Sequence, residues 1–183
     1  PLRRPARSGG PPGIDPATPQ RRGVAAVVVT TIGQATIAGV RVEDIAAHLD
    51  DRGSFAVAYS GPPMVQWNCC VRRRGVLVGL HYHLRQTDYW YFLAGTVRVV
   101  LHDLRAGSPT EGVTIRFGCD AALPRGILIP PGVAHGFAAI TDATLMYLTD
   151  RLHDPDDERG VAWDDPAVAA EWGIVDPILS PRD

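Results

Sequence analysis

The chain has 183 residues, of which 45% are hydrophobic and 21% are charged, and its formal net charge at pH 7 is -2. A chain of this size and composition is expected to form one globular domain with a sizeable core, and it lacks the basic surface of a nucleic-acid-binding protein. All 18 basic residues are arginine, so no lysine is available as a proton donor, Schiff base or phosphate ligand.

The first 23 residues are rich in Pro, Arg and Gly and contain almost no large apolar side chain. Such a segment cannot bury enough surface to order itself, so we expect residues 1–23 to form a disordered N-terminal arm. Residues 24–31 follow an arginine pair, as in a secretion signal, but the apolar run is short and β-branched and indicates a strand. The folded domain is expected to span residues 24–183.

From residue 24 onward, short runs of β-forming residues alternate with turn residues, which indicates an all-β barrel or sandwich. Helical periodicity is confined to residues 42–49. The expected strands are residues 65–71, 76–83, 89–93, 96–103, 114–117, 127–129, 136–140 and 144–149. The last segment, residues 154–183, is rich in Asp, Pro and Trp and is expected to pack across the mouth of the barrel.

The cysteine content points to a reducing compartment. The chain has three cysteines, two of them adjacent, and these do not make an even disulfide framework. No apolar run reaches the roughly 18 residues of a membrane-spanning helix. We therefore expect a cytoplasmic protein with no membrane partner, whose cysteines behave as small apolar residues.

Residues 75–95, GVLVGLHYHLRQTDYWYFLAG, have the spacing G-x5-H-x-H-x4-D-x6-G. Alternate residues of a strand share a face, so His81 and His83 point the same way, and a four-residue turn returns Asp88 beside them. His135, in ILIPPGVAHGF, is a further candidate ligand. Three imidazoles and a carboxylate with an open position suit a divalent metal such as Zn, Fe, Mn, Ni or Co. This arrangement is typical of metal-binding cupins, and no organic cofactor is expected.

A second interpretation of the same residues stays open. His83 and Asp88 can instead form a buried hydrogen-bonded couple, joined by Arg85, with no metal bound.

A longer series of motifs carries a family resemblance. In chain order the motifs are DRGSF (51–55), QWN (66–68), GVLVGLHYH (75–83), HDLRAGSPTEG (102–112), IPPGVAHGF (129–137), LMYLTD (145–150), ERGVAWDDP (158–166) and the terminal LSPRD. Each is weakly specific alone, but in this order they resemble the dTDP-4-dehydrorhamnose 3,5-epimerase family over residues 37–183. The resemblance implies a single-domain, all-β, double-stranded β-helix, which is the jelly-roll cupin fold.

The resemblance also implies roles for individual residues. His81 matches the base that removes a proton next to the sugar ketone, Asp165 the carboxylate that orients this base, and Tyr147 the acid that returns a proton on the opposite face. The positions that match the family's nucleotide-sugar contacts are Arg52, Gln66, Asn68 and His135. A small-molecule substrate and a homodimer are implied in the same way.

Two departures from the family pattern affect these expectations. His83 and Asp88 stand where the family usually has glutamine and the lysine that stabilises the enolate oxygen. Val78 stands where the family usually has an arginine that faces the diphosphate. If His81 binds a metal, its lone pair is occupied, and it cannot also act as the free base.

The favoured function is therefore an epimerase or isomerase that transfers a proton at a carbon next to a carbonyl, most simply on a dTDP-4-keto-6-deoxyhexose in deoxysugar biosynthesis or specialised metabolism. The alternative is a divalent-metal-dependent cupin that acts as a cyclase, isomerase or oxygenase on another small oxygenated metabolite. A non-catalytic binding module is least favoured, because the acid and base positions are retained.

Overall fold

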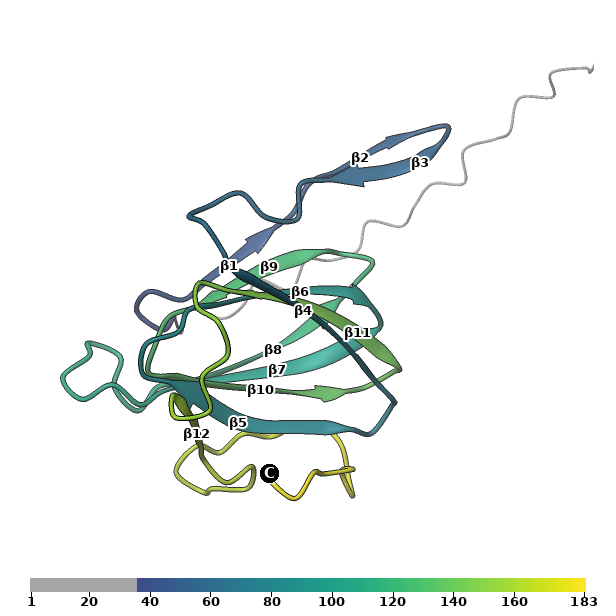
Figure 1. Ribbon diagram of the computed structural model, residues 1–183. Coiled ribbons are helices and arrows are strands. Elements are labelled where there is room, and N and C mark those ends of the chain that lie inside the picture. Colours follow the sequence, from purple (N-terminus) through teal and green to yellow (C-terminus); the bar gives the residue numbers. More distant parts are fainter. Residues whose placement is uncertain (1–35) are drawn as a thin grey trace, which may run out of the picture. The chain divides into compact units, whose positions relative to one another are not determined.

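The structure is a computed structural model that describes residues 36–183, all of which belong to one compact unit. The expected arm (residues 1–23) and the expected strand at residues 24–31 lie outside the described residues. Twelve strands and no helix are assigned in the described part (Figure 1). The strands are β1 (Arg41–Asp44), β2 (Ala47–Asp50), β3 (Gly53–Ala56), β4 (Gln66–Arg72), β5 (Leu77–His83), β6 (Asp88–Ala94), β7 (Thr96–Asp103), β8 (Thr114–Asp120), β9 (Arg125–Ile129), β10 (Val133–Ala139), β11 (Ala143–Thr149) and β12 (Glu158–Gly160).

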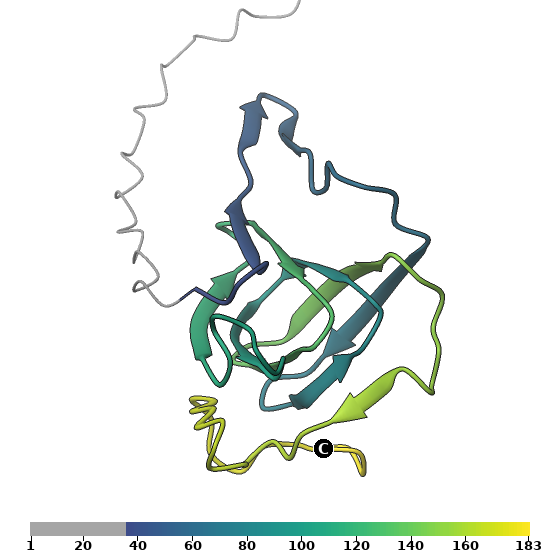
Figure 2. The same cartoon turned by 90° about the vertical axis from the view of Figure 1, so that its left-hand side faces the viewer.

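Ten of these strands form two five-stranded sheets that face each other (Figure 2). The first sheet has the order β1-β9-β6-β11-β4 and the second the order β12-β5-β10-β7-β8. All pairings within the two sheets are antiparallel. Sequential neighbours often lie in different sheets, as β5 and β6 do, which is the connectivity of a jelly roll. The all-β jelly-roll prediction is confirmed.

The main core lies between the two sheets and is built by alternation along the strands. In β7, Val97, Val99 and Leu101 point into this core, where they meet aromatic residues such as Phe92 and Phe137. The intervening side chain, Val100, belongs to a second apolar cluster on the outer face of the second sheet. Both faces of β7 are therefore buried over Val99, Val100 and Leu101, and all three of these residues are apolar.

The C-terminal segment covers that outer face. Val168, Ala170 and Trp172 pack against Leu77 and Leu80 of β5, and the segment runs along the outside of the sheet (Figure 2). Residues 154–183, expected to pack across the barrel mouth, thus place Val168, Ala170 and Trp172 on the outer face, while Glu158 and Arg182 line the cavity between the sheets. The physical reason is that β5 has apolar side chains on its outer face, and these need a cover.

The helical pattern expected over residues 42–49 is also wrong. Residues 41–44 form β1 and extend the first sheet by pairing with β9, and residues 47–50 form β2, which pairs only with β3. Backbone pairing at an open sheet edge outweighs a weak local helical pattern. The β2–β3 hairpin projects away from the two sheets (Figure 1).

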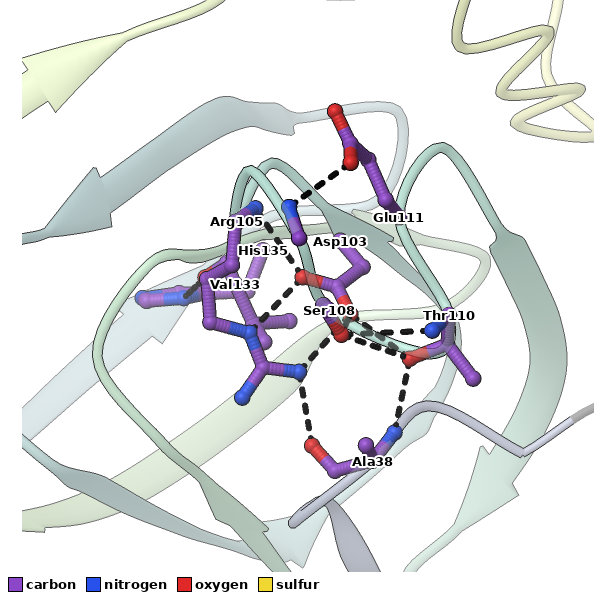
Figure 3. A network of polar contacts seen from close by, with 9 residues as sticks. Ala38, Asp103, Arg105, Ser108, Thr110, Glu111, Val133 and His135 are labelled. Atoms are coloured by element: carbon purple, nitrogen blue, oxygen red, sulfur yellow. Dashed lines mark hydrogen bonds and ion pairs between the residues drawn. The ribbon is translucent and has the colours of Figure 1, made fainter.

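A polar network ties the loop after β7 to the start of the described chain (Figure 3). The buried carboxylate of Asp103 accepts hydrogen bonds from Arg105 Nε at 2.7 Å, Ser108 Oγ at 2.6 Å and Thr110 Oγ1 at 2.6 Å. Arg105 Nη2 also donates to the carbonyl oxygen of Ala38 at 2.7 Å, and the Ala38 amide donates to Thr110 Oγ1. The Arg105 hydrogen bond is the main cause that holds the pKa of Asp103 well below its usual range, although burial opposes this.

Candidate active site

A cavity of about 230 Å³ opens between the two sheets. Strands β5 and β10 line it from the second sheet, while β4, β6 and β11 line it from the first. Three of the four candidate metal ligands line this cavity, namely His81 and His83 of β5 and Asp88 at the start of β6, and His135 of β10 lies beside His81. The candidate ligand atoms of these four side chains all lie within 4.8 Å of one another.

Strand pairing sets His135 beside His81. These two residues are direct partners across β10 and β5, and their ring centroids are 4.3 Å apart. The next residue, Gly136, lies at an irregularity in this pairing, and a Cβ atom there would approach the backbone oxygen of Val78 to 2.5 Å. Only glycine allows the two backbones to come this close, so Gly136 helps to place the two imidazoles together.

Two ring nitrogens of the cluster are buried without a hydrogen-bond partner among the described residues. His135 Nδ1 lies 2.9 Å from the carbonyl oxygen of Val133 and donates to it, which leaves His135 Nε2 as the unpaired atom (Figure 3). His83 Nδ1 is the second unpaired atom. Buried polar atoms without a partner are uncommon in folded proteins. Both nitrogens therefore have a free position for a ligand.

Asp88 is held by donors from its own strand and the preceding loop. Its Oδ1 accepts from Gln86 Nε2 at 2.7 Å, and its Oδ2 accepts from Trp90 Nε1 at 3.3 Å. His135 Nε2 lies 3.6 Å from Asp88 Oδ2. In the described structure no hydrogen bond joins Asp88 to His83, and Arg85 pairs instead with Asp154 and Asp157. The expected alternative, a His83–Asp88 couple joined by Arg85, therefore does not form.

The electrostatics of the cluster favour neutral His81 and His83 rings and an ionised Asp88 carboxylate. Burial lowers the pKa of His81 well below its usual range, with a further contribution from nearby His135, and burial likewise lowers the pKa of His83. Burial would raise the pKa of Asp88, but the His135 ring and the Gln86 amide outweigh it and bring the pKa to about 2. Near neutral pH Asp88 is therefore ionised, and the His81 and His83 rings have free lone pairs.

Tyr147 faces the same cavity from the opposite sheet. It lies on β11, where it pairs with Trp90 of β6 and with Asn68 of β4. Burial raises the pKa of the Tyr147 hydroxyl, and the negative charge of Asp88 raises it further. The hydroxyl is therefore protonated near neutral pH and can donate a proton across the cavity from His81.

Asp165 is not brought to His81. It lies in the segment that covers the outer face of the second sheet, lines a separate cavity with Trp163 and Trp172, and accepts a hydrogen bond from the Ala167 amide at 2.8 Å. The His81 side chain points to the inner side of the same sheet. The expected contact between Asp165 and His81 is therefore not formed, because the sheet separates the two side chains.

The carboxylate that approaches β5 beside His81 belongs to Asp183. Its Oδ1 accepts a hydrogen bond from the Gly79 amide at 2.8 Å, and Asp183 and His81 line one small cavity together with Arg182. His81 Nδ1 lies 3.4 Å from the carbonyl oxygen of Gly79. Sequence reasoning missed Asp183 as a site residue, although the terminal LSPRD motif was the signal that could have identified it.

Of the expected substrate contacts, Gln66 and Asn68 line the cavity, whereas His135 and Arg52 do not. Gln66 Nε2 donates to Asn68 Oδ1 at 2.9 Å, while the buried Asn68 Nδ2 has no partner among the described residues. Arg52 lies in the turn of the β2–β3 hairpin, where it is exposed and pairs with Asp50. A single chain therefore does not bring Arg52 to the cavity.

Charged side chains are also present at the cavity. Arg72, Arg182 and Glu158 line the cavity, and Arg182 pairs with Glu158. Arg72 belongs to a run of three arginines, of which the other two are exposed. Val78 lines the cavity without offering a donor.

Comparison with known proteins identifies relatives over most of the chain. The family model for dTDP-4-dehydrorhamnose 3,5-epimerase matches residues 34–183. A spore coat polysaccharide biosynthesis protein of Bacillus subtilis, SpsL, is 37% identical over 145 residues, which cover 74% of this chain and 96% of that protein. The dTDP-4-dehydrorhamnose 3,5-epimerase of Pseudomonas aeruginosa is 38% identical over 148 residues, which cover 73% of this chain and 82% of the relative.

A solved structure agrees with these relatives. The structure of NovW, a 4-keto-6-deoxy sugar epimerase from the novobiocin gene cluster of Streptomyces spheroides, superposes with a TM-score of 0.77 at 35% identity. The superposition covers 81% of this chain and 82% of NovW. The motif order, the jelly-roll fold and the extent of these matches lead to one conclusion: the chain belongs to the dTDP-4-dehydrorhamnose 3,5-epimerase family.

Proposed function

We propose that the protein is an epimerase that transfers protons at a carbon next to the ketone of a dTDP-4-keto-6-deoxyhexose. The observation that carries this proposal is the placement of His81 and Tyr147 on opposite walls of one cavity. Inversion of a carbon centre requires a base on one face of the substrate and a proton donor on the other. The similarity to epimerases of dTDP sugars and 4-keto-6-deoxy sugars supports the substrate class.

In this proposal His81 is the base. Its depressed pKa keeps the ring neutral, and the contact between Nδ1 and the Gly79 carbonyl leaves Nε2 free to accept a proton. Breaking the carbon–hydrogen bond leaves its electron pair on the substrate as an enolate. Tyr147 then returns a proton to the same carbon from the opposite side, and the configuration inverts.

Asp183 takes the positioning role that the sequence assigned to Asp165. Its hydrogen bond to the Gly79 amide holds it beside β5, two residues from the base. A carboxylate near the imidazole stabilises the imidazolium that forms when His81 accepts the proton. Because Asp183 comes from the end of the chain, the C-terminal segment contributes to the site as well as covering the second sheet.

Polar groups at the cavity provide contacts for the nucleotide sugar. The unpaired Asn68 Nδ2 can donate to a sugar or phosphate oxygen, and Arg72 and Arg182 supply positive charge at the rim. Val78 offers no such contact. This arrangement supports a phosphate-bearing small molecule as the substrate, held more weakly than by a site with an additional arginine.

A homodimer would complete the site with Arg52. The hairpin exposes 81% of Leu49 and 66% of Phe55, and the edge strand β4 exposes 68% of Trp67. Large apolar side chains gathered on neighbouring elements are typical of a protein interface. A second copy packed on this face would bury them and bring the hairpin, with Arg52, towards the neighbouring chain.

The three free cysteines support a reducing, cytoplasmic location. Among residues 36–183, no helix is long and apolar enough to cross a membrane.

A second candidate function is favoured by the cluster of His81, His83, Asp88 and His135. A divalent metal at this cluster would suit a cupin cyclase, isomerase or oxygenase that acts on another small oxygenated metabolite. In that case His81 is a ligand, its lone pair is occupied, and Tyr147 is left to move the proton. Deuterium uptake from heavy water by a 4-keto-6-deoxy sugar nucleotide tests the first function, and consumption of dioxygen would indicate an oxygenase.

A further inference from the structure

We propose that His81, His83, Asp88 and His135 bind one divalent first-row transition metal ion. The inference goes beyond the proposed function: a bound metal occupies the lone pair of His81, so the proton transfer proposed above belongs to the metal-free form. Binding of the metal alone can be measured without any substrate. It is carried by the unpaired donor atoms, by the geometry of the cluster and by the contacts that hold each ligand in place.

The unpaired atoms are the first line of argument. His83 and His135 are 6% and 2% exposed, yet His83 Nδ1 and His135 Nε2 have no hydrogen-bond partner among the described residues. Both side chains belong to the group of four residues that each offer one ligand atom within 4.8 Å of the others. A cation placed between them supplies a partner for both at once, and the ionised Asp88 balances part of its charge.

The spacing of the donors fits one metal ion. Metal–ligand bonds of about 2.0–2.2 Å in a tetrahedral site place ligand atoms roughly 3.4 Å apart. His135 Nε2 and Asp88 Oδ2 are already 3.6 Å apart. The three rings have centroid separations of 4.3, 5.5 and 5.8 Å and are inclined to one another rather than stacked. Small side-chain rotations bring all four donors onto one ion.

The ligands are also oriented by a surrounding shell of contacts. The Val133 carbonyl fixes the tautomer of His135 by accepting from Nδ1, so that Nε2 is the free donor atom. Gln86 and Trp90 hold the two oxygens of Asp88. Metal-binding histidines and carboxylates usually have such partners, which orient the ligands before the metal arrives. All four ligands lie on paired strands, so the site is rigid.

A buried ion pair between His135 and Asp88 is the competing explanation. Their 3.6 Å separation is longer than a hydrogen bond, and the pair would leave His83 Nδ1 without a partner. A metal ion accounts for both observations. The donor set of three nitrogens and one oxygen selects Zn, Fe, Mn, Ni or Co over Ca or Mg, which prefer oxygen ligands.

The experiment is a metal titration of the full chain. Protein stripped with a chelator and dialysed is titrated separately with Zn, Fe, Mn, Ni and Co(II), and the bound metal is measured by elemental analysis. We expect about one ion per chain, visible absorption bands for the Co(II) form, and a higher melting temperature on binding. Wild-type protein that melts cooperatively but binds none of Zn, Fe, Mn, Ni or Co(II) at this stoichiometry would overturn the proposal.

Variants locate the site. Asp88→Asn and His83→Gln should each weaken binding by at least about tenfold, because each removes a direct ligand. His48→Gln is the matched control, since His48 lies on the exposed hairpin outside the cluster, and its affinity should equal that of the wild type. Asp88→Asn preserves the shape of the side chain, so it remains informative if His83→Gln does not fold. Unchanged affinity in folded Asp88→Asn protein would overturn the assignment.

Discussion

His135 and Asp88 come from different sheets, and 3.6 Å separates His135 Nε2 from Asp88 Oδ2. Asp88 lines the cavity whose walls have His81 on one sheet and Tyr147 on the other. Chemistry in this cavity therefore depends on both sheets.

Replacing Tyr147 by Phe should separate proton removal from inversion. The variant loses the donor on the face opposite His81 but retains the base, so a carbon-bound proton can still exchange with solvent. We expect deuterium uptake from heavy water to persist while the epimerised product falls by about 100-fold or more. Mass spectrometry and NMR of the recovered sugar nucleotide measure the two outcomes. Equal loss of exchange and inversion would contradict the assignment of Tyr147 as the opposite-face acid.

Asp183→Asn and Asp165→Asn form a matched pair. The first removes the charge that lies beside β5 near His81, and we expect it to lower the rate of proton exchange by about tenfold or more. The second changes a carboxylate on the outer face of the sheet and should leave the rate unchanged. Initial exchange rates at saturating substrate provide the comparison. A larger loss of exchange rate in Asp165→Asn than in Asp183→Asn would instead assign the positioning role to Asp165, as expected from the sequence.

The roles of Asp183 and Asp165 illustrate which features of the fold and the site could be predicted from the sequence and which could not. The strands were predictable because alternation of apolar residues is local, and the bounds predicted for β7 match the observed Thr96–Asp103. The convergence of His81, His83 and Asp88 was predictable for the same reason, since these residues are separated only by a strand and a turn. The failures all depend on which distant segments meet. Nothing in residues 42–49 reveals that β9 offers them a free edge, and nothing near Asp165 reveals that a sheet separates it from His81.

Binding of dTDP should be weak. Val78 lines the cavity and cannot donate to a phosphate, and the loss of a hydrogen bond to a charged group costs about 1.5–3 kcal/mol, or roughly tenfold or more in affinity. Calorimetry should therefore give a dissociation constant at least about tenfold above that of a family member with arginine at this position. Val78→Arg should tighten binding, and the gain should decrease with added salt. Tight binding of dTDP by the wild-type protein would contradict this prediction and would indicate that Arg72 and Arg182 compensate for the missing arginine.

Asp103→Asn should destabilise the fold in a pH-dependent way. Hydrogen bonds from Arg105, Ser108 and Thr110 hold the folded-state pKa of Asp103 below its unfolded value of about 3.9. Their contribution is therefore fully present above that pH and is lost as the pH falls through the folded-state pKa. Near neutral pH we expect the variant to lose about 1.5–3 kcal/mol of unfolding free energy in urea titrations. The difference from wild type should shrink steadily below about pH 4, and a constant difference would contradict the assignment.

Deuterium incorporation from heavy water into 4-keto-6-deoxy sugar nucleotides tests the proposed proton transfer most directly. If His81 removes a carbon-bound proton, wild-type protein should place deuterium at carbons next to the ketone, and His81→Asn should place none. The assay is run on metal-free and on metal-loaded protein. Uptake in the metal-free form is the predicted result, since Nε2 of His81 is then free, and uptake that requires metal would favour the second candidate function. No uptake by either form across a panel of such nucleotides would contradict the epimerase account.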